Sequence, residues 1–382
     1  MGGVIGNHPS DESGPQEGLT PLTRALRATL CKQPDRDLPD LFQRDVDWET
    51  LVEVAIKNRI AVLFARALRE HAIDPPAVWQ ARLDRYRAET FRNNARNIAT
   101  ADAVSSALRA AGVDVVVFKG PAQQQRLYND PFTKPVGDVD VLVPISQYEQ
   151  ALGALDKTHK LDPDCASPWW RIFLGEQHLR TRDGRLTTVD LHYRLQQPGC
   201  PSPKNIEGFL QRREVATVGA VQLSILSPPD ACLLTCLNVV KALVHREACG
   251  RYLVDLIAGL HALEDHQVAQ MVGTARSEGL IPTMALSLRV LEAVFGFSDP
   301  RVQDVAKAAP ANSMDLVGMT LLPDDPRTVW TKRRDILWML CGQRPIVFIR
   351  EAAWAFAGEM CRQFSHLTRG RLPEGTAEVR RA

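Results

Sequence analysis

The chain has 382 residues, of which 45% are hydrophobic and 24% are charged, and its formal net charge is +1. Such proportions are ordinary for a folded protein with a sizeable core, and the length allows two or three domains of about 100–200 residues. A net charge near zero excludes a general electrostatic affinity for nucleic acid or membrane surfaces. No apolar run reaches membrane-spanning length and the first 18 residues contain no apolar signal segment, so we expect a cytoplasmic protein with no membrane partner.

The first third of the chain is predicted to be helical. Residues 1–18 are rich in Gly, Pro, Ser and acidic side chains and are expected to be disordered. From residue 19 to 111, apolar residues recur at steps of three and four, which is typical of amphipathic helices. The stretch from Trp79 to Ala111 indicates one long or broken helix whose end is marked by Gly112, with an arginine-rich face exposed to solvent.

Residues 112–226 have a different character and predict a compact module containing a small mixed sheet. Its expected elements, in chain order, are a strand at Val113–Phe118, a helix beginning just after Gly120, a strand at Asp138–Val143, a helix at Ser146–Lys157 capped by Ser146, a hairpin of Gln177–Arg182 and Leu186–Arg194 turning at Asp183-Gly184, and a strand pair at Glu214–Val218 and Val221–Leu226.

A second helical region, 227–366, is expected to open at Ser227-Pro228, and a flexible tail at 367–382 follows it. Two polar residues of this region, His245 and Asp255, are expected to pair between helices, because buried polar groups usually bond to one another. The predicted fold class is therefore α+β, with a small mixed sheet core flanked by N-terminal and C-terminal helical regions.

The eight cysteines are scattered along the chain. Cys232 and Cys236 are close, but they lie in an apolar run with no Cys/His pair nearby to complete a zinc site. We therefore predict that the cysteines are free, small buried side chains.

Two aspartates of one predicted strand are the strongest indication of chemistry. Asp138 and Asp140 project from the same face, because side chains alternate along a strand, and two adjacent carboxylates repel unless a cation lies between them. Asp190 lies between apolar neighbours in a later strand, an unfavourable place for a charge unless it faces the same cation. Three carboxylates can hold two divalent cations that clamp the attacking and leaving oxygens of an in-line phosphoryl displacement.

Several residues near these carboxylates are candidates for phosphate or cofactor binding. Lys119 and Gly120 precede a predicted helix start, where a glycine lets a phosphate approach the backbone and the helix end favours anions. Lys134 supplies a further positive charge. His192 shares a strand face with Asp190, and it is either a substrate contact or a half-buried structural residue. A lone Asp-x-Asp is a weak motif, and the order of the surrounding elements gives it weight.

That order of motifs resembles the DNA polymerase β-type nucleotidyltransferase superfamily, and more specifically the bacterial uncharacterised nucleotidyltransferase family. The matching segments are Val117-Phe118-Lys119-Gly120, Leu127-Tyr128-Asn129-Asp130-Pro131, Gly137-Asp138-Val139-Asp140-Val141-Leu142-Val143 and Val189-Asp190-Leu191-His192. The resemblance implies Mg²⁺ ligands at Asp138, Asp140 and Asp190, the last also positioning or deprotonating an acceptor hydroxyl. It extends over about residues 50–260. The superfamily has Gly-Ser where this chain has Lys119-Gly120, and Lys134 stands where the family usually has arginine.

The resemblance implies an enzyme that moves a nucleoside monophosphate from an NTP, expected to be ATP, to an acceptor hydroxyl on a small molecule, peptide or protein. Two Mg²⁺ ions are the expected cofactors, with Mn²⁺ as the alternative. A kinase-like phosphotransferase would use the same metal clamp, and a catalytically silent, antitoxin-like regulatory protein is a third interpretation. Nothing in the sequence indicates nucleic acid as the acceptor, although it stays open.

Overall fold

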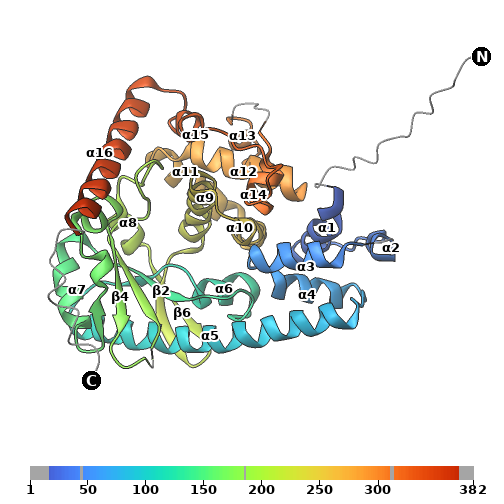
Figure 1. Ribbon diagram of the computed structural model, residues 1–382, viewed down its shortest axis with the longest axis horizontal. Helices are drawn as coiled ribbons and strands as arrows, with labels where there is room; N and C mark the ends of the chain where they lie inside the picture. The colour runs from blue at the N-terminus through green and yellow to red at the C-terminus, as the bar shows by residue number, and fades with distance from the viewer. Residues whose placement is uncertain (1–16, 44–45, 185, 310–313, 370–382) are drawn as a thin grey trace, which may run out of the picture.

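A seven-stranded mixed sheet forms the centre of the computed structural model, which describes residues 17–43, 46–184, 186–309 and 314–369 (Figure 1). The strand order is β3-β4-β5-β2-β1-β7-β6, in which β2 pairs with β5 and β1 with β7 in parallel, and the other neighbours are antiparallel. The strands are β1 Val116–Val117, β2 Asp138–Leu142, β3 His159–Leu161, β4 Glu176–Thr181, β5 Thr188–His192, β6 Glu214–Val218 and β7 Val221–Ile225.

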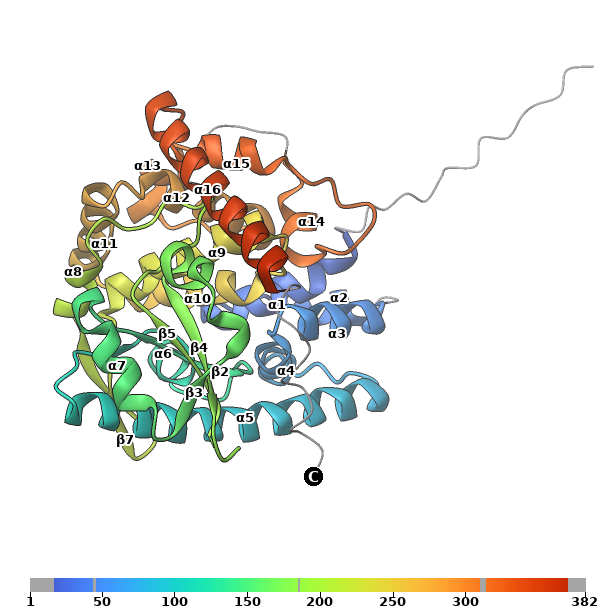
Figure 2. The same cartoon turned by 60° about the vertical axis from the view of Figure 1, so that its left-hand side comes forward.

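One face of the sheet is covered by the long helix α5 (Ala77–Ala110), which runs along the lower side of the molecule in both views (Figures 1 and 2). Apolar side chains of α5, such as Val104 and Leu108, pack there against Val139 and Val141 of β2. Because side chains alternate along a strand, Asp138 and Asp140 face the opposite side of the sheet. The same alternation on β5 places Asp190 on the face of the sheet away from α5.

Helices from both ends of the chain lie on the other side of the molecule and share one apolar core, which includes Leu22, Phe64, Leu237 and Leu256. The N-terminal helices are α1 Thr20–Leu30, α2 Leu38–Gln43, α3 Trp48–Lys57 and α4 Ala61–Glu70. The C-terminal helices are α9 Pro228–His245, α10 Gly250–Ala262, α11 Asp265–Ser277, α12 Ile281–Phe295, α13 Gln303–Ala306, α14 Leu316–Leu321, α15 Arg333–Leu340 and α16 Pro345–Arg369.

Shorter helices connect the strands. They are α6 Pro121–Tyr128, α7 Tyr148–Leu155 and α8 Ile206–Gln211, together with 3-10 turns at Glu17–Leu19, Ile145–Gln147, Pro163–Cys165 and Pro300–Val302 and a π-helical segment at Trp169–Leu174. The prediction that Ser146 caps a helix was wrong: Ser146 lies inside a 3-10 turn, and α7 begins after it without a side-chain cap. Pro144 and the following 3-10 turn delay the start of the α-helix by two residues.

The predicted fold class is confirmed, since the mixed sheet is flanked on both sides in sequence by helices. All eight cysteines are free, as expected, and only Cys361 is not fully buried. The expected disordered start (1–18) lies outside the described residues except for Glu17 and Gly18, which belong to a 3-10 turn, and of the tail (367–382) only the end of α16 is described. Within the described part of the chain, no helix is both long and apolar enough to cross a bilayer.

Candidate functional site

The pairing of β2 with β5 brings the predicted carboxylates together. In this parallel pair Asp140 lies opposite Asp190, and Asp138 lies opposite Thr188. One potential ligand atom from each of Asp140, Asp190 and His192 lies within 4.8 Å of the others. Asp138 is outside that group but faces the same cavity. Two carboxylates and an imidazole at this spacing suit a divalent cation.

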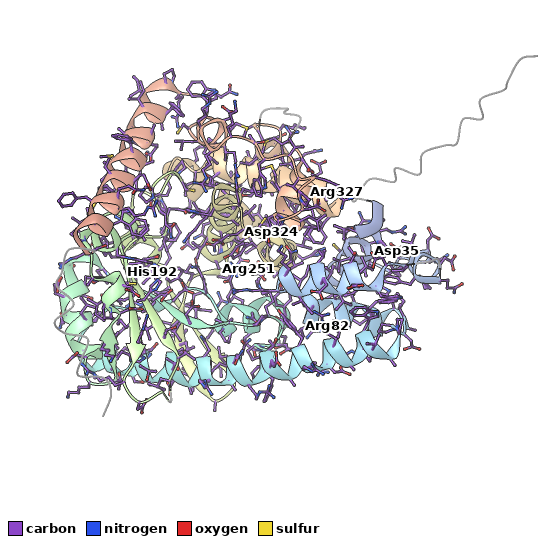
Figure 3. All side chains as sticks on the ribbon, viewed as in Figure 1. Asp35, Arg82, His192, Arg251, Asp324 and Arg327 are labelled. Atoms are coloured by element: carbon purple, nitrogen blue, oxygen red, sulfur yellow. The ribbon has the colours of Figure 1, made fainter. Side chains whose placement is uncertain are left out.

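All seven residues predicted for the site line a single cavity of about 340 Å³. They are Lys119, Gly120, Lys134, Asp138, Asp140, Asp190 and His192. The cavity lies between the free face of the sheet and helices of the two flanking regions, whose contributing residues include Arg59, Lys241 and Arg251. Figure 3 labels His192 on the sheet and Arg251 among the helices beside it.

Asp140 is the best neutralised of the carboxylates. Its Oδ1 lies 2.9 Å from Lys119 Nζ and 3.3 Å from His192 Nε2. Burial opposes ionisation, but the adjacent lysine and histidine outweigh it, so the pKa of Asp140 lies well below its usual range. For Lys119 the balance is similar: burial acts to lower its pKa, and the Asp140 carboxylate raises it overall. The pair is therefore ionised at neutral pH.

The surroundings of Asp190 and Asp138 disfavour the ionised form of each carboxyl group. Burial, followed by the charges of Asp140 and Asp138, raises the pKa of Asp190 to about 7. Burial and the charge of Asp140 likewise raise the pKa of Asp138. The nearest basic group to Asp190 is His178, whose Nε2 is 3.5 Å from Asp190 Oδ2. A bound divalent cation would relieve this repulsion, so the donor set fits such a cation.

Glu176 is a site residue that the sequence interpretation missed. It is buried at the start of β4, where its Oε2 lies 3.2 Å from His192 Nδ1 and its Oε1 lies 3.8 Å from His178 Nε2. Burial acts against its charge, but these histidines hold the pKa of Glu176 at about 2. A carboxylate on Nδ1 leaves Nε2 of His192 directed at Asp140. Because side chains alternate along a strand, the sequence could have indicated that Glu176 and His178 lie on one face of β4.

Lys134 is engaged away from the carboxylates of the sheet. It forms a buried ion pair with Asp255 of α10, which also accepts a hydrogen bond from Tyr128 Oη. The expected pairing of His245 with Asp255 was therefore wrong, because the carboxylate is taken by residues of the sheet module. His245 instead lines the cavity, and its Nε2 is buried without a partner among the described residues.

Gly120 sits at the entrance to α6 with φ of +76°, a conformation that favours glycine. A side chain here would touch Asn97 at 3.5 Å and Val136 at 3.6 Å. The glycine therefore keeps the backbone accessible where it borders the cavity.

Two buried asparagines of α5 hold the loop that leads into β2. Asn94 donates to the carbonyls of Pro131 (2.7 Å) and Lys134 (2.8 Å) and accepts from Val136 N at 3.0 Å. Asn97 donates to the carbonyl of Asp138. The sequence interpretation treated the exposed face of α5 only, although asparagines three residues apart inside a helix are a recognisable departure from helix-forming composition.

Comparison with known proteins places the chain in a family. No curated protein matches it. Among solved structures it is similar to an antigenic nucleotidyltransferase-like protein from Paracoccidioides brasiliensis, at 15% identity and a TM-score of 0.30, over 53% of this chain and 97% of that one. A TM-score this low supports no argument. A family model matches residues 44–296, which include every site residue named above, and the chain therefore belongs to the uncharacterised nucleotidyltransferase family.

Proposed function

We propose that the protein transfers a nucleoside monophosphate from an NTP, with ATP as the expected donor, to an acceptor hydroxyl. The observation that carries the proposal is the register of β2 against β5, which sets Asp140 beside Asp190 in adjacent parallel strands. Membership of the nucleotidyltransferase family supports it. The acceptor is a small molecule, a peptide or a protein.

In this proposal Asp138, Asp140 and Asp190 hold two divalent ions, Mg²⁺ or Mn²⁺, and His192 completes the donor set. The bound ions supply charge neutralisation at the reacting phosphate. Lys119 holds Asp140 ionised and oriented through its 2.9 Å contact.

In the proposed reaction, Asp190 takes the proton that the acceptor hydroxyl loses. The acceptor oxygen forms a bond to the α-phosphorus, the bond from that phosphorus to the β-phosphate oxygen breaks, and pyrophosphate leaves with its electron pair. Asp190, which faces the same cavity as the other two carboxylates, accepts the hydroxyl proton.

The test is incubation of the purified protein with Mg²⁺, an acceptor-containing cell extract, and ATP labelled at either the α or the γ phosphate. We expect the α label to reach the product and the Asp140→Asn variant to lose the transfer. Asp304→Asn, at a fully exposed position on α13, is the matched control. Transfer of the γ label would replace the proposal with a phosphotransferase. If the parent binds no Mg²⁺–ATP in calorimetry and Asp138→Ala behaves like the parent, the protein is instead a silent regulatory protein.

A further inference from the structure

Two arginines from the helical regions before and after the sheet are brought to the cavity by one buried junction. The side chain of Asn58, at the end of α3, accepts a hydrogen bond from Gly250 N at 2.9 Å. The same side chain donates to the carbonyls of Val54 at 3.0 Å and Leu321 at 2.9 Å, so all its hydrogen-bonding atoms are used. Arg59 follows Asn58, and Arg251 follows Gly250. Both arginines line the cavity.

The junction is closely packed. A Cβ atom at position 250 would lie 2.8 Å from Asn58 Oδ1, a distance that real Cβ atoms essentially never show, and 3.0 Å from Asn58 Cβ. Asn58 is fully buried. The positions of the two arginine backbones are consequently fixed relative to each other, although they are far apart in sequence.

Arg59 has an unfavourable backbone conformation. It lies just past α3 with φ of +56°, and the chain closes there through a hydrogen bond of 2.8 Å from Ile60 N to Ala55 O. Glycine is the usual residue at such a helix end, because a side chain in the left-handed region is strained. A strained position beside a cavity points to a use for the side chain that occupies it.

The two guanidinium groups lack counter-ions. Among the described residues, neither has a carboxylate oxygen within 4.0 Å, and Arg251 Nε is buried with no hydrogen-bond partner. Burial and the charge of Arg251 together lower the pKa of Arg59, as expected for neighbouring like charges. Lys119 and Lys134, by contrast, are already paired with Asp140 and Asp255. Among the described residues that line the cavity, Lys241 also has no carboxylate oxygen within 4.0 Å, so the unpaired positive charge of the cavity belongs to the two arginines and this lysine.

We propose that Arg59 and Arg251 bind the β- and γ-phosphates of the nucleotide, and hence the pyrophosphate that leaves. The inference rests on the proposed function and adds the residues that grip the polyphosphate. Guanidinium groups suit this role, since each presents a planar fork of donors to phosphate oxygens. Both arginines line the same cavity as Asp138, Asp140 and Asp190, so the arginine pair faces the space that the proposed metal ligands border.

The test measures binding rather than turnover. Pyrophosphate and the non-hydrolysable analogue of ATP are titrated, with Mg²⁺, into the full-length protein by calorimetry. We expect Arg59→Gly and Arg251→Gln each to weaken binding about 10-fold or more, and Arg59→Lys to weaken it less, because lysine keeps the charge without the fork.

The chain offers a matched control for Arg59→Gly. Arg246 also lies at a helix end with a positive φ (62°) but does not line the cavity. Glycine relieves strain at both positions, so neither variant is expected to lower the melting temperature through its backbone. Arg246→Gly should bind pyrophosphate like the parent.

The outcomes separate this inference from the proposed function. If the parent binds no pyrophosphate, or if Arg59→Gly and Arg251→Gln bind it as tightly as the parent, the arginine site is wrong. If pyrophosphate binding depends on both arginines but no nucleotide label is ever transferred, the arginine site stands and the nucleotidyl transfer fails.

Discussion

At the scale of single residues, two aspartates that lie side by side in the sheet have opposite electrostatic surroundings. Asp140 is neutralised by Lys119 and His192, whereas Asp190 is raised in pKa by burial and by its carboxylate neighbours. The protein therefore keeps one carboxylate ionised at neutral pH and one that takes up a proton near neutral pH. This division matches a site in which one carboxylate anchors a cation and another exchanges a proton.

The raised pKa of Asp190 predicts how the metal-free protein responds to pH. In the unfolded chain an aspartate ionises near pH 4, whereas Asp190 in the folded protein ionises near 7, so between these values the folded state holds the extra proton. The contribution of Asp190 to stability should thus fall as pH rises from about 4 to about 7, by up to about 1.4 kcal/mol per pH unit. Urea unfolding at several pH values in EDTA measures it. Asp190→Asn should flatten this part of the profile, and an unchanged profile would contradict the assignment.

Glu176 is predicted to position His192 for metal binding. Glu176→Gln removes the charge behind Nδ1 at nearly constant volume, and we expect Mn²⁺ binding to weaken about 10- to 100-fold, as found for partners of metal-ligating histidines. Titration followed by electron paramagnetic resonance of free Mn²⁺ gives the affinity directly. Glu149→Gln, at an exposed carboxylate paired with Arg171, is the control. Equal affinities for the two variants would show that Glu176 has no such role.

At the scale of elements, most of the site features that the sequence could predict belong to the strands. Alternation placed Asp138 and Asp140 on one face, and the Asp183-Gly184 turn correctly indicated that β5 follows β4 in a hairpin. These features depend on local geometry with a fixed period of two. The observed strands are shorter than expected at β1, where only Val116–Val117 pairs.

Contacts between distant elements were not predictable in the same way. Lys134 was expected to face phosphate, and it instead neutralises Asp255, because α10 packs against the sheet module and buries that carboxylate. Arg59 and Arg251 escaped notice because their shared cavity depends on the contact between the end of α3 and the start of α10. Periodicity describes the buried face of a helix but not the partner that covers it.

Helix α5 is predicted to maintain the geometry of β2 through Asn97. Replacing Asn97 with alanine removes a hydrogen bond from a buried side chain of α5 to the carbonyl of Asp138 at the start of β2. We expect a loss of about 0.5–1.5 kcal/mol in unfolding free energy, measured in urea, together with weaker Mn²⁺ binding. Asn93→Ala, on the exposed face of the same helix, should change neither quantity. A stable Asn97→Ala variant with normal metal binding would show that α5 does not support the site.

At the scale of the whole molecule, the cavity is assembled from three parts of the chain. The sheet supplies the carboxylates, the turn between α3 and α4 supplies Arg59, and α9 and α10 supply Lys241 and Arg251. The helical regions on either side of the sheet also share one apolar core. Ligand binding at Arg59 and Arg251 should consequently suppress local opening in both helical regions.

Hydrogen–deuterium exchange is expected to report this coupling. With Mg²⁺ and pyrophosphate, amides around Arg59 and at the start of α10 should exchange more slowly, since a ligand that binds only the folded state suppresses local opening. Helix α11, which supplies no residue to the cavity, should be unaffected. Arg59→Gly should abolish the protection in both segments. Protection confined to the sheet would contradict the coupling.

The Asn58–Gly250 junction has a consequence for how this protein can diverge. Any residue larger than glycine at 250 collides with Asn58, and any residue without a side-chain acceptor at 58 leaves the amide of Gly250 without its hydrogen-bond partner. Substitution at either position should displace both arginines together. The pairs Asn58-Arg59 and Gly250-Arg251 are thus structurally coupled, although they lie 192 residues apart in the sequence. In the family, we expect these two dipeptides to be kept together or lost together, giving a signature by which members that grip polyphosphate in this way can be recognised.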